Sequence, residues 1–158
     1  MTFAETLRIC GIVKDRSGGK TSNAASVIMQ RHPKWPAFIC SIATWHRVEP
    51  GTLTLDNCSP LPQVALNEVT PLALEPPPET LFGNDPSYVR LMRKRGQRRF
   101  YCGVAKSESA SYPVVISQQA VPACDHRLEV YAEARLRDVL KVTTGDRVCV
   151  EVVPGLLK

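Results

Sequence analysis

The sequence predicts a mainly β, single-domain protein with a few short helices. Thr52 to Asp56 alternates polar residues with leucines, which is the period-two pattern of a half-buried strand. Arg147 to Val153 repeats the pattern, with valines at alternate positions on one face. The chain has 158 residues, enough to bury one core of its own. We therefore expect one domain that spans residues 1–158.

The first expected strand covers Leu7 to Lys14, with Leu7, Ile9, Gly11 and Val13 on one face. It leads into Asp15 to Asn23, a loop with two adjacent glycines, a lysine and three hydroxyl side chains. Backbone N–H groups of such a loop can wrap a polyphosphate. The loop does not fit the Walker A pattern, and a plain flexible turn is the alternative.

A turn precedes the central strand. Pro50 fixes its own φ and Gly51 tolerates the positive φ of a type II turn, so a strand should begin at Thr52. Leu53 and Leu55 then face a core. The opposite face carries three oxygen-bearing side chains, those of Thr52, Thr54 and Asp56. This face could hold a cation or phosphates, and the alternative is an ordinary half-buried strand.

The middle of the chain contains several prolines, which interrupt helices and strands. We expect a short helix over Ala24 to Met29, ended by His32 to Pro36, and either a helix or a strand over Phe38 to Trp45. A proline-rich excursion follows at about 58–86 and includes a short expected strand, Gln63 to Val69.

Arg90 to Arg99 concentrates six basic residues. We expect a hairpin tip at Gly96 and a strand from Arg99 to Val104. The basic residues fit three alternatives: a solvated face, neutralisation of nucleotide phosphates, or contact with a nucleic-acid backbone.

The last third predicts strands at Tyr112 to Ser117 and Arg127 to Tyr131, and a final strand at Arg147 to Val153. Between the last two, apolar residues at helical spacing predict a short amphipathic helix over Glu133 to Leu140. A Gly145-Asp146 turn enters the final strand.

The composition narrows the class of protein further. The six cysteines stand singly with no Cys-x-x-Cys pair, which argues against zinc and favours buried free thiols, with disulfides left open. The net charge of +5 modestly attracts phosphate-bearing ligands. No apolar run approaches the ~20 residues of a membrane span, and residues 1–7 do not resemble a secretory signal. We expect a cytoplasmic monomer with no membrane partner.

Three segments together resemble a known family. Pro50 to Leu55 resembles a Gly-Thr-Leu-Asn-Leu signature, Gly96 to Val104 resembles a Gly-Lys-Arg-Phe-Phe-Gly-Val stretch, and Arg127 to Asp138 resembles a strand followed by a Leu-Arg-Glu helix. These signatures belong to the CTP-dependent, archaeal-type riboflavin kinases. The resemblance implies a cradle-loop β-barrel and an enzyme that transfers the γ-phosphoryl group of CTP to the 5′-hydroxyl of riboflavin, giving FMN.

The resemblance also implies site residues. Magnesium would be held at Thr52 and Thr54, and Glu129 would contact the flavin and orient or deprotonate its hydroxyl. The residues expected to bind nucleotide are Ser17, Gly18, Gly19, Lys20, Thr21, Ala134, Arg135, Leu136 and Arg137. The chain departs from the family at Thr54, where the family has asparagine, and at Val121, where it has threonine.

A second hypothesis uses the same fold. Strand, helix, Gly-Asp turn and strand also recur in cradle-loop DNA-binding proteins of the AbrB type. A non-catalytic barrel that binds a nucleotide, a flavin or DNA is therefore the alternative, and only under it would nucleic acid be a partner.

Overall fold

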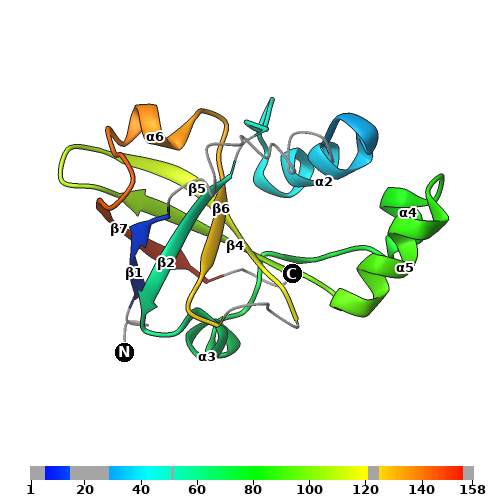
Figure 1. The fold of residues 1–158 in the computed structure, drawn as a ribbon, viewed down its shortest axis with the longest axis horizontal. Helices are drawn as coiled ribbons and strands as arrows, with labels where there is room; N and C mark the ends of the chain where they lie inside the picture. Colours follow the sequence, from blue (N-terminus) through cyan, green and yellow to red (C-terminus); the bar gives the residue numbers. More distant parts are fainter. Residues whose placement is uncertain (1–5, 15–28, 51, 121–124, 155–158) are drawn as a thin grey trace.

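The computed structural model describes residues 6–14, 29–50, 52–120 and 125–154. Its centre is a closed barrel of six antiparallel strands (Figure 1). The barrel strands are β1 (Leu7–Val13), β2 (Leu53–Ser59), β4 (Arg99–Lys106), β5 (Ser111–Gln118), β6 (Leu128–Tyr131) and β7 (Arg147–Val153). They follow the order β4-β5-β6-β2-β1-β7, and β7 pairs with β4 to close the ring. The predicted mainly β barrel with short helices is confirmed.

Alternation along the strands fills the barrel interior. The inward-facing residues of β1, β2 and β7 are almost fully buried: Ile9, Val13, Leu53, Leu55, Val148, Val150 and Val152. Burying a side chain of this size contributes roughly 1.5–3 kcal/mol to folding. The prediction that Leu53 and Leu55 face a core is confirmed, because both side chains are buried. Thr54 and Asp56, on the opposite face of the strand, stay partly exposed.

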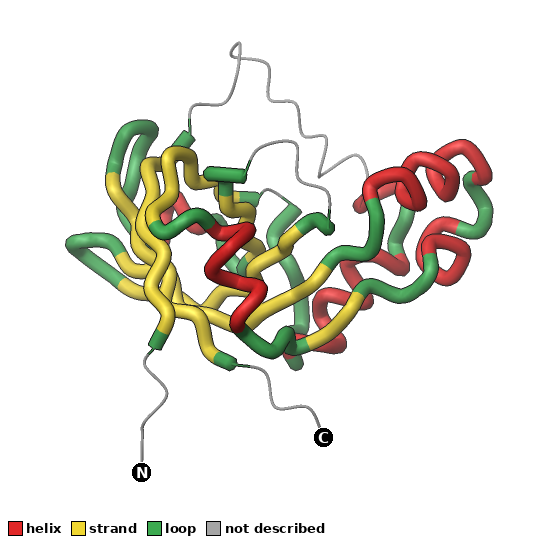
Figure 2. Tube along the Cα trace, turned by 90° about the horizontal axis from the view of Figure 1, so that it is seen from below, coloured by secondary structure: helices red, strands yellow, loops and turns green. Residues whose placement is uncertain are grey.

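A second core lies outside the barrel wall formed by β4, β5 and β6. Phe100, Val115 and Tyr131 alternate with inward-facing neighbours and pack outward against Trp35 and Phe82. The covering helices are α2 (Lys34–Ala43), α4 (Pro78–Phe82) and α5 (Pro86–Arg95), which gather on one side of the barrel (Figures 1 and 2). The wall is therefore buried on both faces at Phe100, Val115 and Tyr131.

The proline-rich excursion is folded rather than extended. The expected strand over Gln63 to Val69 is wrong: this stretch forms α3 (Pro62–Ala65) and the 3₁₀ helix η2 (Leu66–Glu68). Pro62 starts α3, where a proline loses no helical hydrogen bond. Leu66 packs into the barrel interior, and its carbonyl accepts a hydrogen bond from the Tyr101 hydroxyl at 3.1 Å. A two-residue strand, β3 (Ala73–Leu74), then pairs with the start of β4.

The middle region contains helix α2 where either a helix or a strand was expected, since Phe38 to Trp45 lies mostly in α2. A preceding helical stretch ends at Arg31, in agreement with the expected end at His32 to Pro36, and residues 24–28 of the expected Ala24 to Met29 helix lie outside the described residues. Pro36 falls in the first turn of α2. A proline is tolerated there because the first amides have no partner within the helix. The hairpin tip at Gly96 is also wrong, since α5 occupies residues 86–95 and Gly96 follows it with φ 76°.

The C-terminal third follows the prediction closely. β5 covers its expected strand, β6 begins at Leu128, one residue after the expected start, and β7 has the predicted bounds. The expected helix over Glu133 to Leu140 is reduced to one turn, α6 (Leu136–Val139).

The free-thiol interpretation is wrong for two of the cysteines. Cys10 and Cys149 lie directly opposite each other on β1 and β7 and form a disulfide. Cys40, Cys58 and Cys102 are free, and Cys124 lies outside the described residues.

No described helix is both long and apolar enough to cross a membrane.

Candidate functional site

Several of the predicted site segments meet at one end of the barrel, although they are far apart in sequence. The backbone N–H of Lys14, the residue after β1, donates to the carbonyl of Thr54 at 3.0 Å. The Lys14 carbonyl in turn accepts from Nη2 of Arg137 at 2.9 Å. Lys14 therefore joins β2 to α6 at the point where the chain leaves β1.

Strand pairing brings a further predicted residue to the same place. Thr54 on β2 lies directly opposite Glu129 on β6. Directly opposite residues of antiparallel strands have Cα atoms about 4.5–5.5 Å apart and share one face of the sheet. Because Leu53 and Leu55 face the interior, Thr54 and Glu129 both face outward.

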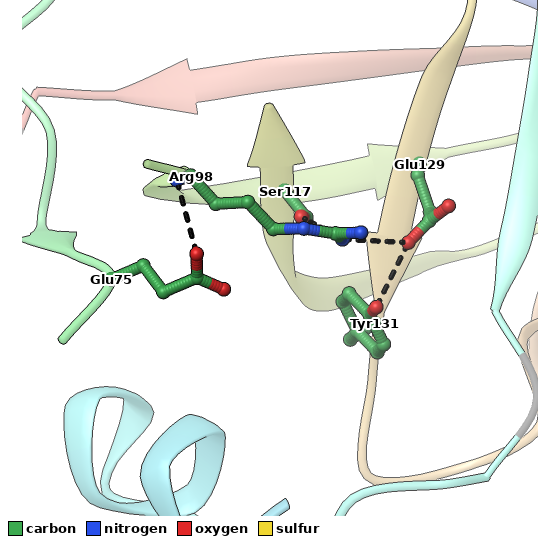
Figure 3. Close-up of polar contacts among 5 residues, drawn as sticks. All are labelled: Glu75, Arg98, Ser117, Glu129 and Tyr131. Carbon is green, nitrogen blue, oxygen red and sulfur yellow. Dashed lines mark hydrogen bonds and ion pairs between the residues drawn. The ribbon is translucent and has the colours of Figure 1, made fainter. Parts of the chain in front are cut away.

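Glu129 is held by one hydrogen bond and one ion pair. Its Oε1 accepts from the Tyr131 hydroxyl at 2.8 Å, and Nη1 of Arg98 lies 3.8 Å from the same oxygen. The same Nη1 donates to Oγ of Ser117 at 3.2 Å. Figure 3 shows the Arg98 side chain reaching across the β-sheet towards Glu129 and Ser117. The carboxylate thus has one oxygen engaged, while 38% of its side chain stays exposed.

The Tyr131 hydroxyl is protonated and donates its hydrogen bond to Glu129. Its ring lies in the second core, and burial followed by the Glu129 charge raises the pKa of its hydroxyl well above the ordinary value. The hydroxyl therefore keeps its proton at neutral pH and points it at Glu129.

Arg98 is a nearly buried cation. Only 12% of its side chain is exposed, and its guanidinium lies 5.6 Å from the centre of the Trp35 ring, within cation–π range. Burial alone lowers its pKa, but Tyr131, Glu129 and Glu75 raise it, and the net pKa of Arg98 is raised. Arg98 therefore stays positively charged beside Glu129.

Glu75 forms the far side of this cluster (Figure 3). Its Oε1 accepts from the backbone N–H of Arg98 at 3.4 Å, whereas its Oε2 is buried with no hydrogen-bond partner among the described residues. Burial raises the pKa of Glu75, and the nearby Arg98 partly opposes this rise.

The metal candidates have suitable chemistry. Thr52 and Thr54 are half-buried and offer hydroxyl oxygens, which suit magnesium when phosphates and waters supply its other ligands. Within the described ranges, no group of three or more His, Cys, Asp or Glu side chains is placed to hold a metal ion. A cation at the two threonines would therefore depend on the phosphates of a nucleotide.

Asp56, two residues further along the same face, is already engaged. Its Oδ1 lies 2.7 Å from Nδ1 of His126 and 3.6 Å from Nε of Arg127. Burial raises the pKa of Asp56, but the Asn57 backbone N–H, the Arg127 charge and the contact with His126 outweigh burial and lower the pKa. Asp56 is thus an ionised partner of His126 and Arg127.

The predicted nucleotide residues divide into two sets. Ser17, Gly18, Gly19, Lys20 and Thr21 lie outside the described residues, as does Val121. In the second set, Leu136 packs its side chain into the barrel interior, which leaves only its backbone for a ligand. Arg135 is exposed and lies 3.8 Å from Asp138, and Arg137 also donates to Oγ1 of Thr144 at 3.2 Å.

Four members of the cluster escaped the sequence analysis: Glu75, Ser117, Tyr131 and Trp35. Tyr131 stands two residues after Glu129 on one strand, so the period of two places both on the same face and could have indicated it. Arg98 was recognised as basic, but nothing in the sequence separates this buried cation from its exposed neighbours. The contacts of Glu75 and Trp35 join segments far apart in the chain, and no local sequence pattern predicts them.

No protein-family model matches the chain, and no curated protein matches it.

Proposed function

We propose that the protein is a phosphotransferase that moves the γ-phosphoryl group of CTP to the 5′-hydroxyl of riboflavin, giving FMN. One observation carries the proposal: the chain of contacts from Arg137 through Lys14 and Thr54 to Glu129. Thr54 comes from one segment that resembles a signature of the CTP-dependent riboflavin kinases, Glu129 and Arg137 come from another, and Lys14 joins the two. Their convergence on one barrel end supports a shared site.

The residues have separable tasks in such a reaction. Phosphoryl transfer passes through a loose transition state, so positioning and charge neutralisation do most of the catalysis. Thr52 and Thr54 would hold magnesium, which neutralises the charge on the phosphates. Arg137 joins α6 to Lys14, whose backbone N–H bonds the carbonyl of Thr54, and so holds α6 against the strand of the two threonines.

Glu129 would act on the acceptor. Its Oε1 is taken by Tyr131, so Oε2 is the oxygen able to accept the riboflavin 5′-hydroxyl proton or orient that hydroxyl. Tyr131 and Arg98 restrict the carboxylate to one position, which favours a defined line of attack.

A second function has its own observation. Arg98 lies 3.8 Å from the Glu129 carboxylate, so the carboxylate is already engaged by a fixed cation of the protein. A barrel that binds a nucleotide or flavin without turnover would use the same contacts for recognition. The departures at Thr54 and Val121 point the same way.

Formation of FMN distinguishes the two functions. Purified protein is incubated with riboflavin, magnesium and either CTP, ATP, GTP or UTP, and FMN is separated and quantified. The phosphotransferase proposal predicts turnover with CTP and a loss of about 10²-fold or more in Glu129→Gln. The control, Glu68→Gln, makes the same change at an exposed position on η2 and should keep the wild-type rate. Binding of riboflavin or CTP with no FMN formed from any nucleotide would favour the non-catalytic barrel.

A further inference from the structure

A hollow lies on the opposite wall of the barrel from Glu129. In the ring of strands, β7 is three steps from β6 in either direction, so the outer faces of these strands point away from each other. The hollow has a volume of about 420 Å³. Its polar lining includes Arg8, Lys106, Ser107, Ser109, Lys141 and Arg147. None of these residues belongs to the candidate site described above.

The charge balance of the lining favours an anion. Arg8, Lys141 and Arg147 have no carboxylate within ion-pair distance among the described residues, whereas Lys106 is paired with Glu151 at 2.9 Å. Two carboxylates also line the hollow. That of Asp146 accepts from the Thr143 N–H at 2.8 Å and so is directed at its own turn, and Glu108 is exposed. Arg8, Lys141 and Arg147 are therefore three lining cations outside the ion pairs of the described residues, against two carboxylates in the same lining.

The walls of the hollow are fixed by contacts between distant segments. The Ser107 hydroxyl donates to the carbonyl of Leu140 at 2.6 Å, which ties the β4–β5 turn to the end of α6. The same oxygen accepts from the N–H of Ala110 at 3.2 Å. At the floor, the disulfide between Cys10 and Cys149 joins β1 to β7, the two strands that carry Arg8 and Arg147. These contacts fix the backbone from which the exposed side chains of Arg8, Lys141 and Arg147 extend.

The size of the hollow limits the ligand. Small-molecule sites have volumes of roughly 300–1,000 Å³, and this hollow lies near the lower end of that range. Arginine and lysine side chains with nearby hydroxyls are the groups that bind phosphate oxygens most strongly in proteins. A nucleic-acid backbone would instead need a continuous basic track across several elements.

We propose that this hollow, lined by Arg8, Lys141 and Arg147, binds a compact phosphate-bearing anion. The site is separate from the Glu129 cluster and does not rest on the proposed kinase activity. Its ligand class is defined by two or more linked phosphate groups, which three cations can contact together.

Calorimetric titration of the full chain tests the proposal. Inorganic pyrophosphate, CTP and citrate are titrated separately at physiological salt, without riboflavin. We expect pyrophosphate to bind, and Arg147→Gln and Arg8→Gln each to weaken it by about tenfold or more, since a hydrogen bond to a charged group contributes roughly 1.5–3 kcal/mol. The control is Arg90→Gln, which removes an exposed arginine of α5 and should leave the affinity unchanged.

The comparison of ligands identifies the source of the phosphates. CTP binding that weakens in Arg147→Gln assigns the hollow to nucleotide phosphates, and CTP binding that is insensitive to Arg147→Gln assigns it to free pyrophosphate; both support a phosphate site. The proposal is overturned if pyrophosphate does not bind at physiological salt, or if Arg90→Gln weakens it as much as Arg147→Gln. Equal binding of citrate would reject the phosphate class. Tighter binding of a DNA duplex that depends on Arg147 would replace the proposal with a nucleic-acid surface.

Discussion

The hydrogen bond between Tyr131 and Glu129 allows a quantitative test of the site. Tyr131→Phe removes one oxygen and leaves the aromatic ring, which is only 3% exposed, in the second core. No cavity of consequence forms, so the change isolates the 2.8 Å hydrogen bond to Oε1 of Glu129.

The expected loss follows from the exposure of the acceptor. A hydrogen bond to a charged group contributes roughly 1.5–3 kcal/mol when both partners are buried. The Glu129 side chain is 38% exposed, so water can replace the lost donor, and we expect a loss of about 1 kcal/mol. In a chain of this length, that corresponds to a fall of about 2–4 °C in Tm.

Urea unfolding, with the slope m held in common, measures the loss. The control is Tyr112→Phe, since no described residue bonds to the Tyr112 hydroxyl, and its effect should stay within about 0.5 kcal/mol. A double-mutant cycle with Glu129→Ala completes the test, because Tyr131→Phe should then cost little. An equal loss with and without the Glu129 carboxylate would refute the hydrogen-bond account.

Two further predictions concern stability. Burial raises the pKa of the Glu75 carboxyl above its ordinary value of 4.5. The folded protein therefore binds the carboxyl proton more tightly than the unfolded chain does. As a result, the stabilising contribution of Glu75 falls as the pH rises above 4.5. Glu75→Gln should remove this contribution, so the difference in free energy of unfolding between wild type and variant should shift against the wild type from pH 4.5 towards neutrality; a constant difference across that range would contradict the burial argument. Gly11→Ala places a Cβ 2.6 Å from Sγ of Cys58 and 2.9 Å from the backbone oxygen of Asp56, and should lower stability by roughly 1–3 kcal/mol. Adding Cys58→Ala should recover only part of that loss, because the Asp56 backbone remains; complete recovery would show that the backbone contact is harmless.

Elements defined by a local sequence pattern were predicted correctly, whereas contacts between distant segments were not. The strand from Arg147 to Val153 was predicted with its bounds because alternation of valines is local and strong. Helix α5 was not predicted, because its basic residues were interpreted as part of a hairpin with its tip at Gly96. Its own signal was present, since Asp85 accepts from the Tyr88 N–H at its start and Pro86 follows.

The candidate site was predictable only in part, for a related reason. Resemblance indicated Thr52, Thr54 and Glu129, which lie in short recognisable segments. The partners of Glu129 come from β4, β5 and the second core, and their proximity arises from barrel closure. The disulfide has the same origin, because Cys10 and Cys149 become neighbours only when the first and last strands pair.

The most direct test of the phosphotransferase account is the magnesium dependence of FMN formation from riboflavin and CTP. Wild type, Thr52→Ala and Thr80→Ala are compared, the last making the same change at an exposed position on α4. The account predicts turnover in wild type and Thr80→Ala, and in Thr52→Ala either no turnover or a much higher magnesium concentration for half-maximal rate. An unchanged magnesium dependence in Thr52→Ala, or folded wild-type protein that forms no FMN, would contradict it.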